Sequence, residues 1–483
     1  MRVLRSENEL RQLSRDSGML ELMPAAAYVA STESEVVEAI SEAKSRGVAL
    51  TPRGGGTSIP SQSVGRGFIL LQERRGAKLD GAGGVNCEPA LVKADLNTIL
   101  DARGLWMPVD PSSYRSCTVG GMVANNSSGS RSYKYRSTIE YVQELHAVLP
   151  EEGLVRIGSL PIDEALAAEG TTGVVARLLV ENERSIRDEA PRVTKNSSGY
   201  RLEKVIHDGL LDLPRLFVGS EGTLGVVTRI KFTTRPKPTS SALLIYETDL
   251  AELDGLTAAL RGHSPSAIEL VDKSVFLQTG RGERVKAFSK TDEDYLVFCE
   301  FDGSSSEEVM KTLEAVAGNP RLSRFEATAM TDPGDLARAW EVRNETLTIA
   351  AEMKKGSRLP LPGVEDLVVP PEKLGDLVRV LLGAFERRGL DYISYGHAGD
   401  ANLHMRPLLD PTSQAERRIL EELMEECFEA VWKMGGSITG EHGDGMLRAP
   451  YVERQYSHTY ALMKEIKRLY DPKNLMNPGV KIL

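Results

Sequence analysis

The sequence predicts an α+β protein of two or three domains, and three observations lead to this class. The chain has 483 residues, which is too many for one hydrophobic core. Its first glycine-rich segment, residues 52–60, lies between two apolar runs, which indicates strand–loop–strand and not the strand–loop–helix unit of a Rossmann fold. After a break at residues 236–241, strand-like and helix-like runs alternate, as in a module with an antiparallel sheet.

Composition excludes several classes of function. The net charge of −10 argues against a nucleic-acid partner, because phosphate binding requires clustered Lys and Arg. No apolar run approaches the roughly 18 residues of a membrane span, and the N-terminus lacks the apolar core of a signal peptide. The four cysteines are far apart, which argues against an iron–sulfur cluster or a disulfide framework. We therefore expect a cytoplasmic protein, with membrane association only through a partner and a homodimer as one open oligomeric state.

The first segments predict a helix and then a strand before the glycine-rich loop. Thr32 to Glu35 has the pattern of a capping box, and apolar residues follow at helical spacing as far as Gly47. Residues 48–51 are typical of a strand. In the loop that follows, adjacent glycines let backbone amides approach a diphosphate and form an anion-binding nest. A mobile surface turn is the alternative.

Two further segments are rich in glycine and in small polar residues. Residues 108–113 and 117–129 suit close contact with a polar, planar ligand, so we expect a ligand-binding loop there. A flexible linker is the alternative, although interleaved apolar residues disfavour it. Residues 218–227 indicate a turn followed by a strand.

The second half is predicted to hold an α+β module that ends in a hairpin. Strands are expected at 243–246 and 295–301, and helices near 249–262 and 305–317. Residues 392–395 and 402–405 look like paired strands around a tight turn, followed by a helix with an apolar face over residues 419–432.

The hairpin carries the clearest chemical signal. It would bring His397 near His404, and Glu441 with His442 follows in a glycine-flanked turn. Two imidazoles and a carboxylate suit a divalent cation such as Zn²⁺ and leave a coordination position open. His442 could then take a proton from a bound substrate. The alternative is two histidines hydrogen-bonded within the hairpin.

In this order, the segments resemble the FAD-linked oxidases of the vanillyl-alcohol oxidase and p-cresol methylhydroxylase (PCMH) superfamily. The branch is that of the glycolate oxidase catalytic subunit, D-lactate dehydrogenase and D-2-hydroxyglutarate dehydrogenase, and the resemblance runs from about residue 25 to the C-terminus. It implies a two-lobed PCMH-type FAD-binding domain (1–237), a ferredoxin-like α+β substrate or cap domain (238–430), and a C-terminal segment (431–483) that returns to the FAD domain.

The resemblance also implies a set of flavin-binding positions. Relatives with covalent flavin carry histidine where this chain has Thr57, so the FAD should be non-covalent. The implied FAD-binding residues are Arg53, Gly54, Gly55, Gly56, Thr57, Ser58, Pro111, Ser112, Thr118, Gly120, Gly121, Ala124, Asn125, Ser128, Gly129, Glu221, Gly222, Gly225 and Asn477.

By the same resemblance, His397, His404 and Glu441 are the metal ligands and His442 is the catalytic base. The metal would be Zn²⁺, with Mn²⁺ or iron as alternatives. Arg343 would clamp the substrate carboxylate, since a guanidinium suits that bidentate task. The remaining implied substrate residues are Asn402 and Arg358, with Lys354 or Lys355 as alternatives to Arg358. Leu347 departs from relatives that carry a hydroxyl residue at this position.

These features predict an FAD-dependent dehydrogenase that oxidises a small D-2-hydroxy acid to the 2-oxo acid. The sequence ends where fused relatives continue into an iron–sulfur domain, and it shows no nicotinamide fingerprint or haem motif. We therefore expect a separate electron acceptor: an iron–sulfur subunit, an electron-transferring flavoprotein or a quinone-linked carrier. The alternatives are a non-catalytic flavin subunit of an electron-transfer complex and an enzyme like the flavin-dependent alkylglycerone-phosphate synthase.

Overall fold

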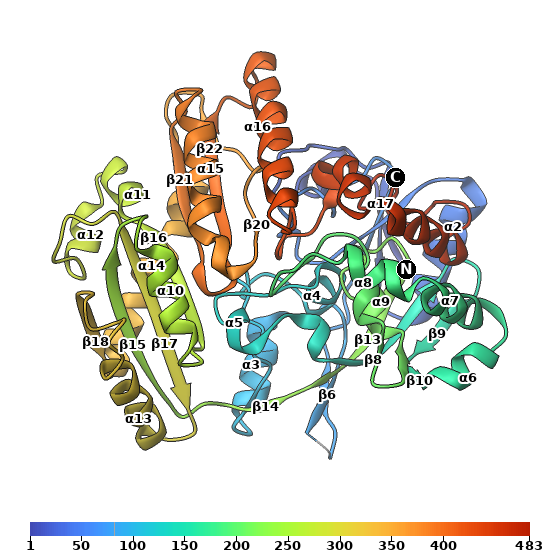
Figure 1. Ribbon diagram of the computed structural model, residues 1–483. Helices are drawn as coiled ribbons and strands as arrows, with labels where there is room; N and C mark the ends of the chain where they lie inside the picture. The colour runs from blue at the N-terminus through green and yellow to red at the C-terminus, as the bar shows by residue number, and fades with distance from the viewer. Residues whose placement is uncertain (82) are drawn as a thin grey trace.

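The computed structural model describes residues 1–81 and 83–483, apart from the side chains of Leu347 and Ala351. The fold is mixed α+β, as predicted, and Figure 1 shows two bodies side by side. The first body, on the right, contains β1 to β14 and both chain termini. The second body, on the left, is built around the sheet that contains β15 to β22.

The first body begins with a small sheet in the order β1-β2-β4-β3, in which β2, β4 and β3 run parallel. Thr32 caps the helix on this sheet by accepting from the Glu35 amide, and Gly47 ends it with φ 62°. The capping box is half formed, because the Glu35 carboxylate accepts from the Ser31 amide. The predicted strand–loop–strand is confirmed. The elements are β1 (Arg2–Leu4), β2 (Ala26–Ala30), α2 (Glu33–Arg46), β3 (Leu50–Arg53) and β4 (Phe68–Gln72).

An antiparallel sheet in the order β5-β6-β13-β8-β9 completes the first body. Its strands are β5 (Ala77–Leu79), β6 (Gly84–Cys87), β8 (Val142–Leu149), β9 (Gly153–Ile157) and β13 (Val226–Thr233). The smaller elements are α1 (Glu7–Leu13), α3 (Lys93–Asp101), β7 (Leu105–Trp106), α5 (Ser132–Tyr135), η1 (Thr138–Glu140), β10 (Ser159–Pro161), α6 (Ile162–Ala167), α7 (Gly170–Glu181), α8 (Glu183–Glu189), η2 (Leu202–Lys204), β11 (Ile206–His207), β12 (Leu210–Asp212), α9 (Pro214–Phe217) and β14 (Arg235–Pro236).

The expected ligand-binding loop at residues 117–129 contains a short helix, α4 (Val119–Asn125). Thr118 caps this helix by accepting from the Gly121 amide, and Asn126 ends it with φ 51°. Met122 and Val123 lie about one turn after Val119, and all three side chains are buried. Burial of this apolar face stabilises the helix despite its two glycines.

The second body is one antiparallel sheet in the order β18-β15-β17-β16-β21-β22-β19, with β20 also paired to β22. Helices α10, α13, α15 and α16 pack on one side, and α11, α12 and α14 share a second cluster on the other. The strands are β15 (Ser240–Thr248), β16 (Ala267–Asp272), β17 (Tyr295–Gly303), β18 (Ala327–Met330), β19 (Leu359–Pro360), β20 (Leu367–Val368), β21 (Tyr392–His397) and β22 (Asn402–Leu409). The helices are α10 (Leu253–Arg261), α11 (Lys273–Gln278), α12 (Gly282–Lys286), α13 (Ser306–Ala317), α14 (Pro333–Glu352), η3 (Pro371–Lys373), α15 (Leu374–Glu386), η4 (Ala398–Asp400) and α16 (Gln414–Lys433).

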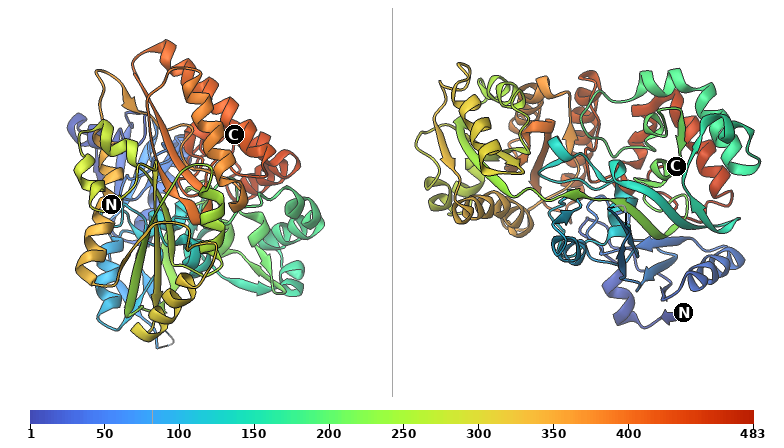
Figure 2. Two further views of the ribbon diagram at one scale, coloured as in Figure 1. Left: turned by 60° about the vertical axis from the view of Figure 1, so that its left-hand side comes forward. Right: turned by 90° about the horizontal axis from the view of Figure 1, so that it is seen from below.

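The last helix, α17 (Gly445–Tyr470), leaves the second body and packs on the first. Its buried residues share a core cluster with α7 and β8, and Figure 2 shows it beside the helices of the first body. The loop between α16 and α17 therefore crosses from one body to the other.

A partly buried ionic cluster joins the two bodies. The guanidinium of Arg131 donates from Nε and Nη2 to the Glu300 carboxylate at 2.7 and 2.8 Å, and from Nη1 to Asp110 at 2.8 Å. Trp340 donates from its indole to Glu300 at 2.8 Å. Glu300 lies in β17 and Arg131 precedes α5, so the contact fixes the second body against the first.

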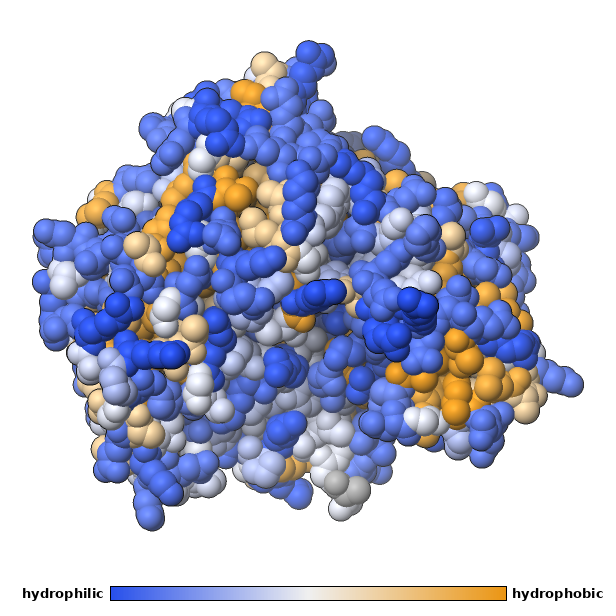
Figure 3. Space-filling model, viewed as in Figure 1, coloured by the Kyte–Doolittle hydropathy of each residue, from blue (hydrophilic) through white to orange (hydrophobic). Residues whose placement is uncertain are grey.

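The surface is largely hydrophilic on the face shown in Figure 3. An apolar area lies at the lower right of this view, over the first body. Leu154 and Val180 are among the exposed large hydrophobic residues of the described part of the chain. In the part of the chain that the structure describes, no helix combines the length and the apolar character needed to cross a bilayer.

Candidate active site

The β21–β22 hairpin places two histidines on one face of the sheet. Tyr395 pairs with His404 and His397 pairs with Asn402, so all four side chains share that face. Ala401 closes the turn with φ 51°. The imidazoles of His397 and His404 lie edge to face, with ring centroids 5.2 Å apart. The hairpin and the proximity of the two histidines were both predicted.

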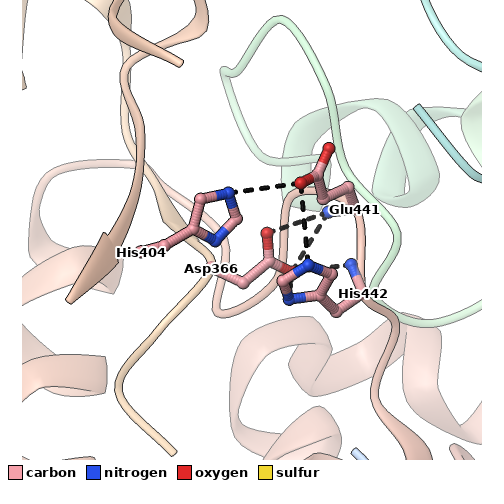
Figure 4. Close-up of side chains that lie close together, drawn as sticks. All are labelled: Asp366, His404, Glu441 and His442. Atoms are coloured by element: carbon pink, nitrogen blue, oxygen red, sulfur yellow. Dashed lines mark hydrogen bonds and ion pairs between the residues drawn. The ribbon is translucent and has the colours of Figure 1, made fainter. Parts of the chain in front are cut away.

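Glu441 is the centre of the site. Its Oε1 lies 3.1 Å from Nε2 of His397 and 3.2 Å from Nε2 of His404. Nε2 of His442 lies 3.6 Å from the same oxygen, and Figure 4 shows His404, Glu441 and His442 pointing toward one another. Ligands of a tetrahedral zinc ion lie about 3.3 Å apart, given bonds of about 2.0–2.1 Å. The ligand atoms of Asp366, His404, Glu441 and His442 all lie within 4.8 Å of one another, which suits a single divalent cation. His397 contacts Glu441 but lies outside this group, so its role as a ligand stays a prediction.

The other oxygen of Glu441 is held by the first body. Oε2 accepts from Ser128 Oγ at 2.9 Å and from Lys195 Nζ at 3.1 Å. Oε1 is left facing the imidazoles, so the carboxylate is set to offer one oxygen to a cation. Ser128 was predicted to bind the flavin, whereas no sequence pattern pointed to Lys195.

Each imidazole of the cluster also has a buried carboxylate behind it. Nδ1 of His397 lies 2.8 Å from Glu269, and Nδ1 of His404 lies 3.4 Å from Glu365. Nδ1 of His442 lies 2.8 Å from the same Glu365 carboxylate, in an ion-pair contact that lacks hydrogen-bond geometry. At His397 and His404, the carboxylate at Nδ1 favours the tautomer that presents Nε2 to a metal or a substrate. Sequence reasoning missed Glu269, which belongs to β16.

The site loop is shaped by Asp366. Its carboxylate accepts from the amides of Glu441 and His442, the latter at 2.8 Å, and from the Thr439 hydroxyl. Asp366 also lies close enough to His404, Glu441 and His442 to count as a candidate metal ligand. Because its oxygens already accept from the backbone, we assign it to holding the loop. Asn402 donates to Asp366 and to the Leu367 carbonyl, both at 3.1 Å, so its substrate role stays a prediction.

Charge balance in this interior requires cations. Burial opposes ionisation of Glu441, but Lys195 and His397 outweigh it and hold the pKa of this carboxyl well below its usual range. Burial lowers the pKa of His397, and the Glu269 carboxylate outweighs this effect and raises it to about 9. Burial and Glu365 likewise oppose each other at His442, whose pKa is raised. Protons on the imidazoles and a divalent cation are alternative ways to neutralise these carboxylates.

Arg343 lies beside the cluster but is already bonded. It is 1% exposed on α14, donates from Nε and Nη2 to Glu269 at 2.8 and 2.5 Å, and packs over the Tyr395 ring. Glu269 thus joins Arg343 to His397. Arg358 pairs with Glu416 of α16, and its side chain is 42% exposed. The side chain of Leu347 lies outside the described residues.

The segments expected at the diphosphate also meet. A Cβ on Gly54 would lie 2.5 Å from Thr118 Oγ1, so the glycine permits the first loop to approach α4. Gly54 and Gly55 are exposed, and Gly56 to Ser58 are partly buried. Arg53 donates to the carbonyls of Arg15 and Ser63 at 2.8 and 3.1 Å, so its guanidinium shapes this loop.

Asn125, Glu221 and Asn477 connect the flavin segments to the histidine cluster. Asn125 donates to the Glu441 carbonyl at 2.8 Å, and Asn477 donates to the Glu221 carbonyl at 2.8 Å. The Glu221 carboxylate accepts from the amides of Asp444 and Gly445 at 2.8 and 2.9 Å. The contacts of the remaining expected positions with a flavin stay predictions. They are Pro111 and Ser112 before α4, Gly120, Gly121 and Ala124 within it, Gly129 after it, and Gly222 and Gly225 before β13.

Comparison with known protein families defines the class of protein to which the chain belongs. The FAD binding domain model matches residues 24–158, and the model of the C-terminal domain of FAD linked oxidases matches residues 238–480. Together with the fold, these matches define an FAD-dependent oxidoreductase. The chain belongs to the family of FAD-linked oxidases.

Several of its relatives have the names of enzymes that act on 2-hydroxy acids. It is 29% identical to a D-2-hydroxyglutarate dehydrogenase of Pseudomonas putida, over 97% of this chain and 49% of that protein. It is 27% identical to the glycolate oxidase subunit GlcD of Bacillus subtilis, over 95% of this chain and 88% of the relative. A D-lactate dehydrogenase of Archaeoglobus fulgidus is 29% identical, over 93% and 89%. The chain thus spans about half the length of the Pseudomonas protein.

Solved structures share the fold. Crystalline p-cresol methylhydroxylase with bound substrate superposes with a TM-score of 0.71 at 14% identity, covering 100% of this chain and 94% of the other. Alkyldihydroxyacetonephosphate synthase gives 0.65 at 16% identity, covering 99% and 82%. At these identities the likeness establishes the architecture alone.

Proposed function

We propose that this protein is an FAD-dependent dehydrogenase that oxidises a D-2-hydroxy acid to the 2-oxo acid. The observation that carries the proposal is the convergence of His397, His404 and His442 on one oxygen of Glu441 beside the flavin segments. The names of the relatives, which include lactate, glycolate and 2-hydroxyglutarate enzymes, support the same reaction class.

We propose that FAD is held non-covalently by the loop 53–58, by the segment 111–129, and by the residues around Glu221 and Asn477. FAD, when bound, supplies a hydride acceptor at N5 for the hydrogen on C2 of the substrate. Thr57 offers no imidazole for a covalent link. Acid precipitation should therefore release all the flavin, and flavin retained in the pellet would contradict the non-covalent assignment.

His397, His404 and Glu441 would hold the divalent cation, with Zn²⁺ preferred for two imidazoles and a carboxylate and Mn²⁺ or iron as alternatives. When bound, this cation acts as a Lewis acid on the hydroxyl group of the substrate. Lys195 and Ser128 orient the Glu441 carboxylate toward it. Glu269 orients the imidazole of His397.

His442 is the proposed base. Its Nδ1 lies against Glu365, so Nε2 is the nitrogen that is free to take the hydroxyl proton. Glu365 stabilises the resulting imidazolium, and Arg448 holds Glu365 by donating to its Oε1 at 2.7 Å and to its carbonyl at 2.8 Å. As C2 loses a hydride and the oxygen loses a proton, the carbon–oxygen double bond of the 2-oxo acid forms.

Arg343 is proposed to bind the substrate carboxylate. Its Nη1 contacts Thr346 at 3.3 Å while the other two nitrogens hold Glu269, so any substrate contact must involve Nη1 or the release of Glu269. Asn402 and Arg358 are also proposed to contact the substrate. The amide nitrogen of Asn402 already donates to Asp366, and Arg358 already pairs with Glu416.

We propose that electrons leave to a separate iron–sulfur subunit, electron-transferring flavoprotein or quinone-linked carrier. The name of the Bacillus relative, a glycolate oxidase subunit, supports a multi-subunit arrangement. It also keeps a non-catalytic flavin subunit as the second candidate, which the intact cluster around Glu441 disfavours.

Anaerobic mixing with D-lactate, glycolate, D-malate and D-2-hydroxyglutarate tests the function. At least one acid should bleach the flavin, and steady turnover should then need an added acceptor dye. If none bleaches it, the dehydrogenase proposal fails. Rapid peroxide formation in air without an acceptor would contradict the separate electron acceptor.

A further inference from the structure

Another cationic side chain, Arg406 of β22, lies beside the cluster. Alternate residues of a strand point to one face, so Arg406 lies on the same face as His404 and Asn402. Its Nη2 lies 3.7 Å from Oε2 of Glu365, the oxygen that contacts Nδ1 of His442 at 2.8 Å. The guanidinium is thus a close neighbour of the proposed base.

Arg406 differs from the other arginines near the site because its contact with a carboxylate is a long ion pair. The 3.7 Å distance from its Nη2 to Glu365 exceeds hydrogen-bond range. Within the residues that the structure describes, its Nε is buried without a hydrogen-bond partner, and the side chain is 14% exposed. By contrast, Arg343 is bonded to Glu269, Arg448 to Glu365, and Arg358 to Glu416.

A largely buried guanidinium with one long ion pair and an unpartnered Nε is costly, because the group has lost water without gaining hydrogen bonds. Its planar fork matches a carboxylate, which can accept two parallel N–H bonds from it. The partial exposure shows that the group can still be reached. These properties suit the binding of a further anion in addition to Glu365.

We propose that Arg406 binds a carboxylate of the substrate beside His442. The inference rests on the proposed 2-hydroxy-acid reaction and deepens it, since nothing in the sequence pattern assigned this residue. A guanidinium here orients the acid so that its hydroxyl group faces Nε2 of His442. The carboxylate is either the one on C1 or a second one at the far end of a dicarboxylic acid, and the experiment separates the two.

The test uses the full-length holoprotein and the variants Arg406→Gln and Arg406→Lys, with Arg379→Gln as a matched control. Arg379 is an exposed arginine of α15 that pairs with Asp376, far from any role assigned above. FAD and metal content are measured first, and both should equal those of the wild type. Flavin reduction is then followed in single turnover with D-lactate, glycolate, D-malate and D-2-hydroxyglutarate.

For Arg406→Gln, we expect the apparent Kd of the acid to rise by about 10- to 100-fold, the range for one hydrogen-bonded charged partner. Arg406→Lys should recover part of the loss, and Arg379→Gln should match the wild type. An increase with all four acids identifies the C1 carboxylate, whereas an increase confined to D-malate and D-2-hydroxyglutarate identifies the distal one. An increase of less than tenfold with every acid overturns the proposal.

A second measurement separates this inference from the reaction itself. Binding of pyruvate and 2-oxoglutarate is followed by calorimetry, which needs no flavin chemistry. If no acid reduces the wild-type flavin but these anions bind in an Arg406-dependent way, the reaction is wrong and the anion site stands. If the acids reduce the flavin and neither anion depends on Arg406, the site is wrong and the reaction stands.

Discussion

Lys195 contacts Glu441 in the interior, with Nζ 3.1 Å from Oε2 and side-chain exposures of 2% and 11%. Lys195 belongs to the first body, and Glu441 lies in the loop that crosses between the two bodies. Their contact holds a carboxylate that also faces three imidazoles, so the pair combines a structural and a chemical role. This relationship gives the first prediction.

Lys195→Met should destabilise the metal-free protein far more than the metal-bound protein. Removing one member of a buried ion pair typically costs about 3–5 kcal/mol, because the remaining charge stays buried. A bound cation would take over the neutralisation of Glu441. The midpoint of thermal unfolding, with and without Zn²⁺, checks this. Lys44→Met is the matched control, since the surface pair of Lys44 with Glu151 should contribute at most about 1 kcal/mol. Equal losses for both variants would contradict the prediction.

Removal of any proposed ligand should abolish stoichiometric metal binding while FAD stays bound. We expect this for His397→Ala, His404→Ala and Glu441→Ala, because three protein ligands leave no redundancy. Elemental analysis and the flavin spectrum are the measurements. His263→Ala, at a partly buried histidine that contacts Asn319, should retain both groups. Full metal occupancy in any ligand variant would remove that residue from the set.

Metal affinity should increase with pH up to about 9. A ligand imidazole must be neutral, and the pKa of metal-free His397 is raised to about 9 because Glu269 outweighs the effect of burial. Below that pH a proton competes with the cation, so the apparent affinity for Zn²⁺ falls as pH falls. Competition titrations with a chelator between pH 6 and 9 measure this apparent affinity for Zn²⁺. An affinity that does not change over this range would show that His397 does not have to lose a proton.

His442→Ala should keep FAD and metal and lose the chemical step. General-base catalysis contributes about 10²- to 10⁴-fold, so flavin reduction in single turnover should slow by about 100-fold or more. Stopped-flow absorbance at saturating substrate is the measurement. A rate equal to that of the wild type would exclude His442 as the base.

Arg343→Lys should reduce kcat/KM by more than about tenfold, or about 1.4 kcal/mol, because the planar fork is lost while the charge remains. The structure adds a second reason, since that fork also holds Glu269 against His397. Steady-state kinetics with an acceptor dye measures kcat/KM for the variant. An unchanged kcat/KM would rule out both the binding of the substrate carboxylate by Arg343 and a need for its contact with Glu269.

Local sequence was sufficient to predict the hairpin and its two histidines. Strand alternation on both sides of a tight turn brings His397 to His404, and this geometry depends only on neighbouring residues. Glu269 and Lys195 could not be found in this way, because they meet His397 and Glu441 across 128 and 246 residues of chain. Such contacts depend on how the two bodies pack.

Helix α4 and the partner of Arg358 show what the sequence can and cannot indicate. The helix α4 was hidden by its glycines, yet the Thr118 cap and the spacing of Val119, Met122 and Val123 are typical of a helix start. Arg358, which was expected near the substrate, pairs with Glu416, and its contact with a substrate stays a proposal. An arginine in a loop takes whichever carboxylate the fold presents, and the sequence does not show which one that is.

The position of Glu441 in the loop between α16 and α17 has a consequence for the order of folding. Its partners Ser128 and Lys195 lie 313 and 246 residues earlier in the chain, so ordering this loop closes very long stretches of polypeptide. Contacts of this separation form slowly and late. The cluster of histidines around Glu441 should therefore be among the last parts to become native, after the hydrophobic cores of the two bodies have condensed. Zn²⁺ added to a refolding mixture should leave the early kinetic phases unchanged and act only on the final one.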